Sequence, residues 1–355
     1  MKKDNPEKIL MVGNEVIGEA AVSAGCRFYA GYPITPQNEL TAYMSKRMPE
    51  VGGVFIQAES ELAAINMVFG ASCVGERAMT SSSSPGISLK QEGISYLAGC
   101  QLPAVIVNMT RGGPGLGNIA PAQSDYFQAT RGGGHGDYRT VVLAPNSVQE
   151  LFDLTYLAFG LADEYRVPVI ILGDGALGQM AEPVELEPHI RYKLTNNKKD
   201  WALRGNKTGK HKIIRSLLLG KGALERHNRR LEEVYNKIKD KEVRFEGFYL
   251  DDAKLILVAF GTSSRICKKA MEVLRSEGEK IGMIRPITLW PFPYDIINKK
   301  AEDNVKFLTV EMNMGQMVED VRLAVEGKAP VHFYGRPGGE IPTEKEIIEQ
   351  IRGII

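Results

Sequence analysis

The chain has 355 residues, of which 43% are hydrophobic and 25% charged, and its formal net charge is +1. This length suits two or three domains that each bury a core, and the near-neutral charge gives no electrostatic case for binding nucleic acid or an anionic membrane. The charged start predicts no signal peptide, and no run approaches the ~20 apolar residues that span a membrane, so we expect a soluble, cytoplasmic protein.

Residues 1–184 alternate apolar runs with amphipathic helical stretches. Val105–Met109 and Val167–Leu172 are short and β-branched, which is typical of parallel strands buried on both faces. Between them, Ser147–Ala162 has apolar residues at helical spacing behind a serine suited to cap the helix. Repeated strand–helix units predict a doubly wound α/β domain with a parallel sheet.

Charged residues become frequent over 185–251, which we interpret as a partly helical connecting region. Leu224–Lys239 predicts an exposed amphipathic helix, and acids interleaved with its bases favour a solvated face over an RNA contact. Residues 252–355 predict a second, smaller α/β domain. Its strand candidates are Leu255–Phe260, Lys280–Arg285, Val305–Glu311 and Val331–Tyr334, and its helices are expected near Ser263–Ser276, Gly315–Val325 and Thr343–Ile351.

The four cysteines, Cys26, Cys73, Cys100 and Cys267, lie far apart and form no C-x-x-C pair. Iron–sulfur clusters and structural zinc need closely spaced thiolates, because one loop usually supplies two ligands. We therefore interpret all four as structural thiols. Any iron–sulfur cluster that works with this chain would belong to another chain.

The loop Gly31–Pro36 follows a strand expected at Arg27–Ala30. Active sites on open α/β sheets gather at the carboxyl ends of strands. Pro36 is expected to open the next helix, with Thr35 as its N-cap and the hydroxyl at the end of the strand. A rigid turn with a capping threonine accounts for the same residues without any function.

In Phe55–Ala71, Glu59 and Glu61 open a helix that is otherwise almost entirely apolar or small. The helix dipole favours acids there, which is a purely structural explanation. Yet a helix that is apolar on most faces is buried, and a carboxylate partly withdrawn from water can exchange a proton near neutrality. Because the two acids are two positions apart, at most one of them should point into a site.

Two more loops follow expected strands. Thr80–Gly86 offers hydroxyls and helix-start amides that could hold an anion or a polar ring, although capping explains them equally well. In Met109–Asn118, Arg111 can present its guanidinium to a carboxylate, or it is a surface arginine on a flexible turn. The glycines of this loop make a weak dinucleotide fingerprint, because Pro114 and Pro121 follow and no helix opens at once.

Together these motifs resemble the α-type subunit of the 2-oxoacid:ferredoxin oxidoreductases, nearly end to end. The motifs that carry the resemblance are Tyr32–Pro36, Gln57–Met67, Ser82–Gly86, Gly132–Tyr138, Arg285–Phe292 and Glu311–Met317. Gly113–Ile119 and Leu172–Pro183 look most like the branched-chain, 2-oxoisovalerate enzymes of the family. The resemblance implies a pyrimidine-type thiamine-diphosphate-binding domain and a transketolase C-terminal-like domain.

The resemblance also implies roles for single residues. The family's cofactor-activating glutamate precedes a Gly-Ala pair by nine and ten positions, so Gly70 and Ala71 select Glu61. This glutamate should hydrogen-bond N1′ of the aminopyrimidine and favour the imino tautomer that deprotonates C2. Thr35 and Arg111 match the threonine near the substrate and the arginine that pairs with its carboxylate. The cofactor-binding set implied in this way comprises Tyr32, Pro33, Glu61, Ser84 and Pro85.

The diphosphate site of thiamine enzymes is expected on another chain. Gly173–Gly175 and the pair Asn196–Asn197 imitate the usual G-D-G and asparagine motif, but only 20 residues (176–195) separate them. Pro183 and Pro188 lie in this gap, which lacks the helix and strand that should return the asparagines to the metal. The resemblance implies a β-type partner that holds diphosphate and Mg²⁺, with γ-type and ferredoxin-like δ-type subunits, [4Fe–4S] clusters, coenzyme A and ferredoxin.

The implied reaction is oxidative decarboxylation of a 2-oxoacid, with 2-oxoisovalerate favoured, to acyl-CoA and CO₂ with reduction of ferredoxin. The same chemistry on 2-oxoglutarate or pyruvate is an alternative. So are a non-catalytic scaffold of the same fold, a transketolase-like or sulfonate-type thiamine enzyme that releases no electrons and, more distantly, a nicotinamide dehydrogenase. Retention of Glu61, Thr35 and Arg111 argues against the scaffold.

Overall fold

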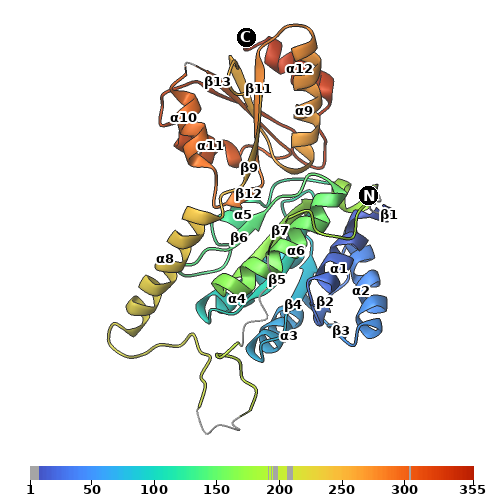
Figure 1. The fold of residues 1–355 in the computed structure, drawn as a ribbon, viewed down its shortest axis with the longest axis vertical. Helices are drawn as coiled ribbons and strands as arrows, with labels where there is room; N and C mark the ends of the chain where they lie inside the picture. Colours follow the sequence, from blue (N-terminus) through green and yellow to red (C-terminus); the bar gives the residue numbers. More distant parts are fainter. Residues whose placement is uncertain (1–7, 191, 193, 195–198, 206–210, 304) are drawn as a thin grey trace, which may run out of the picture.

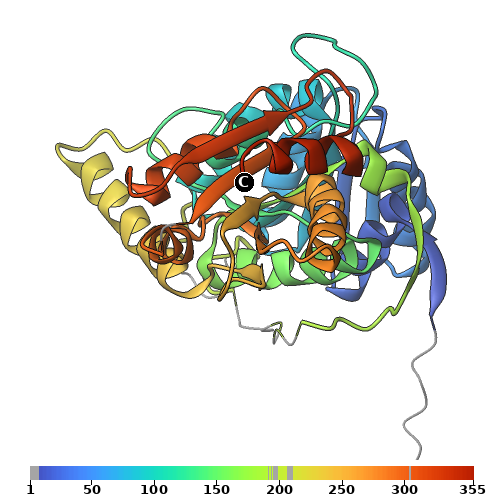
Figure 2. The same ribbon diagram turned by 90° about the horizontal axis from the view of Figure 1, so that it is seen from above.

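A computed structural model describes residues 8–355 except 191, 193, 195–198, 206–210 and 304. The chain forms two α/β domains of unequal size, and the smaller C-terminal domain lies on one end of the N-terminal domain (Figures 1 and 2). The larger sheet has the strand order β12-β6-β7-β5-β4-β2-β3. All its pairings are parallel except that of β12 with β6.

The strands of this sheet are β2 (Phe28–Gly31), β3 (Val54–Gln57), β4 (Ala78–Ser82), β5 (Ala104–Thr110), β6 (Val141–Leu143), β7 (Pro168–Asp174) and β12 (Thr288–Trp290). Every residue of β5 and β7 is buried, as expected for central parallel strands covered on both faces. The helices around the sheet are α1 (Gly13–Ser23), α2 (Asn38–Glu50), α3 (Glu61–Cys73), α4 (Ser84–Gly99), α5 (Tyr126–Thr130), α6 (Val148–Tyr165) and α7 (Gly175–Gln179).

The prediction for α6 is confirmed in detail. The helix begins at Val148, and Ser147 is its N-cap, with the serine oxygen accepting a hydrogen bond from the amide of Glu150.

A small antiparallel pair, β1 (Ile9–Val12) and β8 (Ala181–Val184), lies beside the larger sheet.

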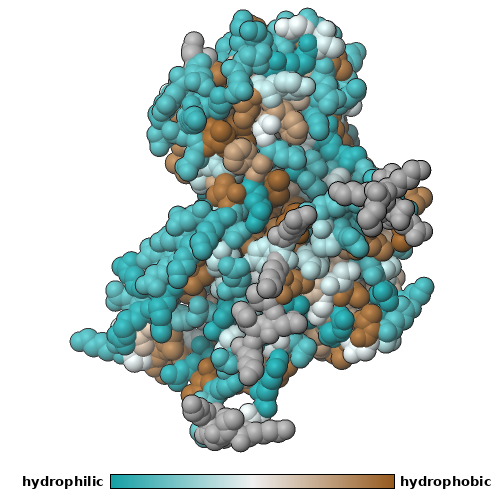
Figure 3. Space-filling model, viewed as in Figure 1, coloured by the Kyte–Doolittle hydropathy of each residue, from teal (hydrophilic) through white to brown (hydrophobic). Residues whose placement is uncertain are grey.

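The helix predicted over Leu224–Lys239 is α8 (Ala223–Lys241), which runs along the outside of the molecule (Figure 1). Only Leu231, Tyr235 and Ile238 of α8 are buried, and its outer face is hydrophilic (Figure 3). The solvated face predicted for this helix is therefore confirmed.

The second sheet has the order β14-β13-β10-β11-β9, parallel except for β9. Its elements are β9 (Phe245–Phe248), β10 (Leu255–Val258), β11 (Ile281–Pro286), β13 (Lys306–Glu311), β14 (Val331–Gly335), α9 (Gly261–Ser276), α10 (Tyr294–Ala301), α11 (Met317–Val325) and α12 (Glu344–Arg352). The four predicted strands and three predicted helices of this part are all present.

Two short strands connect the two domains in a way that the sequence did not predict. β9 comes before the predicted domain boundary at residue 252, but it is an edge strand of the second sheet. β12 comes after this boundary, but it is an edge strand of the first sheet. β9 and β12 are short and carry little apolar pattern of their own, so long-range pairing forms them.

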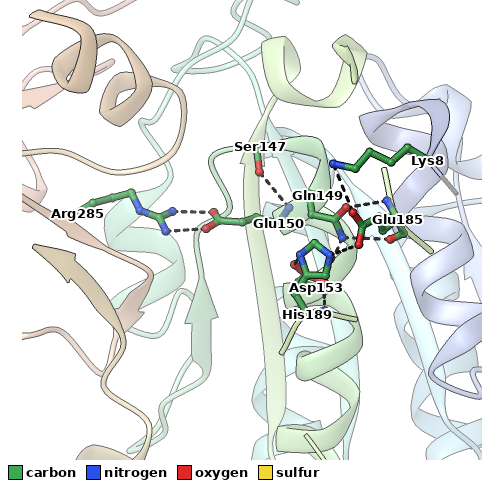
Figure 4. A network of polar contacts seen from close by, with 8 residues as sticks. All are labelled: Lys8, Ser147, Gln149, Glu150, Asp153, Glu185, His189 and Arg285. Atoms are coloured by element: carbon green, nitrogen blue, oxygen red, sulfur yellow. Dashed lines mark hydrogen bonds and ion pairs between the residues drawn. The ribbon is translucent and has the colours of Figure 1, made fainter. Parts of the chain in front are cut away.

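The second domain lies over the carboxyl ends of β5, β6 and β7. Arg285, at the end of β11, donates to both carboxylate oxygens of Glu150 at 2.7 Å each (Figure 4). Gln123, in the loop after β5, donates from its side chain to the carbonyl of Phe260 at 2.8 Å. Its backbone amide donates to the carbonyl of Met312 at 3.0 Å, and its Oε1 accepts from the amide of Met312 at 3.1 Å. This placement leaves the carboxyl ends of β2, β3 and β4 uncovered by the second domain.

Candidate active site

The strand order brings the predicted site loops together. Strands β5, β4, β2 and β3 are consecutive neighbours, so the loops at their carboxyl ends share one edge of the sheet. These loops carry Arg111, Ser82–Gly86, Tyr32–Thr35 and Glu61 in that order.

Glu61 is the first residue of α3, and its position is set by the cap before it. Ser60 is the N-cap, and its oxygen accepts a hydrogen bond from the amide of Ala63 at 3.1 Å. Glu61 is 6% exposed, whereas Glu59 lies before the helix and is exposed. The expectation that only one of the two acids points inward is confirmed, and that acid is Glu61.

The burial predicted for this helix is only partly correct. Leu62 is 47% exposed, and Asn66 and Gly70 are also exposed. One face of α3, with Leu62 as its large apolar side chain, is therefore uncovered in the single chain.

The Glu61 carboxylate lies against the start of α4. A Cβ placed on Gly86 would meet Oε1 of Glu61 at 2.6 Å and Oγ of Ser82 at 2.0 Å. Gly86 thus leaves the space in which these two side chains converge. The hydroxyls of Ser82 and Ser83 are buried and have no hydrogen-bond partner among the described residues.

Capping does not explain the serines of this loop. Ser83 is the N-cap residue of α4, but its side chain makes no capping hydrogen bond. Ser84 Oγ instead accepts a hydrogen bond from the amide of Arg111 at 3.1 Å. Buried hydroxyls without partners are rare in proteins, and an absent ligand is one explanation for them. Glu61 and the two free hydroxyls, which the bare Gly86 allows to lie close together, fit a flat polar ring such as an aminopyrimidine.

Arg111 is buried at the end of β5, so the alternative of an exposed arginine on a flexible turn is wrong. Its Nη1 donates to the backbone carbonyl of Thr35 at 2.9 Å and its Nη2 to that of Leu116 at 3.4 Å. Nε has no partner, and no carboxylate of the described residues forms an ion pair with this guanidinium. A buried cation with carbonyl contacts and no acid partner is suited to bind an anion.

Thr35 lies beside Arg111, but it does not cap a helix as predicted. The amide of Gln37 donates to the carbonyl of Ile34 at 3.1 Å, so residues 34–37 form a turn and α2 begins only at Asn38. The N-cap is Gln37, which makes no side-chain cap. The hydroxyl of Thr35 is partly exposed and accepts a hydrogen bond from Asn38 Nδ2 at 3.3 Å.

The remaining predicted residues line the same edge. Tyr32 and Pro33 are exposed, with the Tyr32 carbonyl accepting from Gln37 Nε2 at 3.5 Å. Ser84 is buried, and Pro85 is partly buried in the first turn of α4. No contact among the described residues assigns a role to Tyr32, Pro33 or Pro85.

Two buried polar groups near the site were missed from the sequence. Lys90, on α4, donates to Thr80 Oγ1 at 3.0 Å and lies 3.4 Å from the carbonyl oxygen of Glu61. Asp125 accepts from Asn108 Nδ2 at 2.9 Å, and burial raises the pKa of its carboxyl. Neither had a clear signal in the sequence, because Lys90 stands in the polar run Lys-Gln-Glu and Asp125 lies in an irregular loop.

The carboxylate of Asp174, in the G-D-G sequence, already accepts hydrogen bonds from its own chain. It is the N-cap of α7, with Oδ1 accepting from the amides of Ala176 and Leu177 at 3.0 and 3.2 Å. Thr262 of the second domain also hydrogen-bonds to it, and burial raises its pKa. Asn196 and Asn197 lie outside the described residues.

The cysteines form no disulfide among the described residues. Cys26 and Cys267 are fully buried. Burial raises the pKa of Cys26 to about 12 and also raises that of Cys267, which suits inert structural thiols.

A hollow of about 760 Å³ lies elsewhere, at the junction of the two domains. Arg131, Trp290 and Tyr294 are in its wall, and none of the predicted site residues is. Over the described ranges, no group of three or more His, Cys, Asp or Glu side chains could hold a metal ion. A search of the same ranges finds no helix with the length and apolarity to cross a membrane.

Two family models match the chain. The thiamine-diphosphate-binding domain of pyruvate flavodoxin/ferredoxin oxidoreductase matches residues 19–245, and core domain II of pyruvate:ferredoxin oxidoreductase matches residues 253–347.

Curated proteins and solved structures agree with these matches. The ketoisovalerate oxidoreductase subunit VorB of Methanothermobacter thermautotrophicus is 49% identical over 346 residues, 97% of each chain. The 2-oxoglutarate synthase subunit KorA of Methanothermobacter marburgensis is 36% identical over 98% of this chain and 99% of its own. A 2-oxoglutarate:ferredoxin oxidoreductase from Magnetococcus marinus, solved with 2-oxoglutarate, coenzyme A and succinyl-CoA bound, has a TM-score of 0.87 and 28% identity. The match covers 98% of this chain and 65% of that one.

Proposed function

Because this chain belongs to the pyruvate flavodoxin/ferredoxin oxidoreductase family, we propose that it is the pyrimidine-binding subunit of an enzyme acting on branched-chain 2-oxoacids. The reaction is oxidative decarboxylation of 2-oxoisovalerate with coenzyme A, giving the acyl-CoA and CO₂ and passing two electrons singly to ferredoxin.

The observation that carries this proposal is the buried Arg111 beside Thr35. An unpaired guanidinium in the protein interior is strongly destabilising unless an anion accompanies it. Its Nε has no partner among the described residues, and its Nη groups contact only the carbonyls of Thr35 and Leu116. A 2-oxoacid supplies the missing carboxylate, and Thr35 Oγ1 lies on the residue that Arg111 contacts.

Glu61 is proposed to hold a proton at N1′ of the aminopyrimidine. Thiamine diphosphate, when bound, supplies the carbon nucleophile for decarboxylation. Ser82 and Ser83 would give their free hydroxyls to the ring, and the bare Gly86 lets the side chains of Ser82 and Glu61 converge beside it. Tyr32, Pro33, Ser84 and Pro85 complete the proposed wall. At 6% exposure, the Glu61 side chain is largely shielded from bulk water.

Substrate preference is inferred from the relatives. The greater identity is to a ketoisovalerate oxidoreductase subunit, at 49%, against 36% for a 2-oxoglutarate synthase subunit. A difference of one or two methylenes in an apolar pocket changes specificity only about 10- to 200-fold. Overlap with pyruvate-type substrates is therefore expected, with 2-oxoglutarate a weaker alternative.

The site is proposed to be completed by a partner chain. Large apolar side chains next to the site residues are exposed, among them Leu62 at 47%, Leu116 at 81% and Ile119 at 65%. Such side chains rimming a polar site are typical of protein interfaces. With Asp174 occupied as a helix cap, we assign the diphosphate and Mg²⁺ to a β-type subunit. The [4Fe–4S] clusters would belong to partner subunits, and γ-type and ferredoxin-like δ-type subunits would complete the complex in the cytoplasm.

The test is an anaerobic purification of the tagged chain from its native host. The complex is assayed for CoA-dependent viologen reduction with 2-oxoisovalerate, 2-oxoglutarate and pyruvate. We expect brown partner chains and the highest kcat/KM with 2-oxoisovalerate. A complex that binds thiamine diphosphate but reduces no acceptor would favour the electron-free thiamine chemistry. An intact complex without either property would favour the scaffold.

A further inference from the structure

The side chain of Lys90 is fully buried beside Glu61, although lysine is almost never fully buried without a charged partner. Its Nζ donates to Thr80 Oγ1 on β4 at 3.0 Å, and a second contact at 3.4 Å reaches the carbonyl oxygen of Glu61. No carboxylate of the described residues forms an ion pair with it. Lys90 therefore keeps a charge in the interior with only neutral hydrogen-bond acceptors.

The charge of Lys90 acts on the Glu61 carboxylate. Gly86 is one helical turn before Lys90 on α4, so the two residues share a helix face. The Glu61 side chain lies within 2.6 Å of where a Cβ of Gly86 would be. The carboxylate and the ammonium thus approach the same turn of α4, one through its side-chain oxygen and the other through the Glu61 carbonyl.

The titration of Lys90 falls near neutrality. Burial lowers its pKa to about 8, and the negative charge of Glu61 opposes this shift. Glu61, from α3, is the charged group that faces it, and Thr80, from β4, is neutral. At pH 7 Lys90 carries its proton, and it loses that proton as the pH rises through 8.

We propose that Lys90 is a positioning residue for Glu61. Its ammonium is a stronger hydrogen-bond donor than the neutral amine, and it holds the carbonyl of Glu61 at the first turn of α3, which fixes where the carboxylate lies. This inference rests on the proposed function and adds a residue of this chain to it.

The first test is the pH profile of the reconstituted complex carrying Lys90→Met. The wild-type complex should show a fall of kcat/KM centred near pH 8. The variant should lack this fall and should be slower at pH 7, by up to about 100-fold for a misplaced group. Lys46→Met, the same substitution at an exposed site on α2, is the control and should change neither property.

The second test is thermal unfolding of the full chain against pH, which needs no turnover. Below pH 8 the folded chain buries a charge that the unfolded chain leaves in water, so Lys90 lowers stability there. This penalty disappears as the pH rises from about 8 toward the ordinary value of 10.5. Lys90→Met should therefore raise the unfolding midpoint at pH 7, and its advantage should shrink above pH 8.

Thr80→Val keeps the proposal testable if Lys90→Met does not fold. It removes one acceptor of the charged ammonium, so the fall in kcat/KM should move below pH 8. A wild-type profile in both variants, or a stability difference that does not change with pH, would overturn the proposal. Failure of the proposed function is separate, because the wild-type complex would then turn over no 2-oxoacid.

Discussion

Arg111 and Lys90 are two basic side chains that the chain buries at its site without an acid partner among the described residues. Each lowers stability, because a charge is removed from water with only carbonyl or hydroxyl contacts in return. Groups that break the rules of core composition in this way are concentrated at functional sites. Arg111 contacts the carbonyl of Thr35, and Lys90 contacts that of Glu61, so each cation adjoins a residue of the proposed site.

Arg111→Met should therefore weaken the binding of the substrate more than the binding of the cofactor. Loss of a hydrogen-bonded charge pair corresponds to a rise of roughly 10- to 100-fold in KM for 2-oxoisovalerate. The Kd for thiamine diphosphate should change by less than about threefold, since the same contact is not used. Steady-state kinetics and calorimetric titration measure the two quantities. A larger loss of cofactor affinity would make Arg111 a cofactor residue, and Arg229→Met on exposed α8 should alter neither.

At the scale of elements, the first turn of α3 positions the acid of the site. Ser60 caps α3 through the amide of Ala63, as Ser147 caps α6 through that of Glu150. The two caps have the same chemistry and the same 3.1 Å distance, but only the first adjoins the site.

Ser60→Ala and Ser147→Ala should each lower the free energy of unfolding by about 1 kcal/mol, the usual value of a serine N-cap. Only Ser60→Ala should also reduce turnover, because Glu61 is the next residue. Urea denaturation and kcat of the complex separate the two effects. Equal activity in both variants would contradict a positioning role for this cap.

Elements with a strong local signal were predictable from the sequence, whereas the edge strands β9 and β12, which pair with a sheet of the other domain, were not. The α6 helix with its serine cap and the buried strands β5 and β7 have local signals that tertiary packing does not override. The start of α2 was misplaced because a turn at 34–37 displaces the helix by two residues. Glu61 and Arg111 were predictable from the loops they occupy. Lys90 was not, since the buried face of α4 depends on what packs against it.

At the scale of the molecule, the second domain covers the carboxyl ends of some strands of the first sheet and leaves those of others free. It lies over the ends of β5, β6 and β7, where Asp174, Gln123 and Glu150 are in contact with it. The ends of β2, β3 and β4 stay available for a partner chain. The crossed strands β9 and β12 tie the two sheets together, so the domains are not independent bodies.

Glu150→Ala should weaken this junction. Arg285 is 1% exposed and would lose its bidentate partner, which costs about 3 kcal/mol when a buried cation is left behind. Glu246→Ala is the matched control. Its carboxylate lies 3.0 Å from Arg285 Nε but is 47% exposed and lacks hydrogen-bond geometry, so its loss should cost less than about 1 kcal/mol. Equal urea midpoints for the two variants would contradict the account of the junction.

The central claim is that Glu61 of this chain is the proton partner of a cofactor whose other end is held by another subunit. The most direct measurement compares Glu61→Gln with Glu59→Gln in the reconstituted complex, by CoA-dependent viologen reduction with 2-oxoisovalerate. Glu61→Gln should assemble normally and lose about 10²- to 10⁴-fold in kcat, the range for a general acid–base group, whereas exposed Glu59→Gln should remain active. Near-normal turnover of Glu61→Gln, or an equal loss in both variants, would contradict the claim.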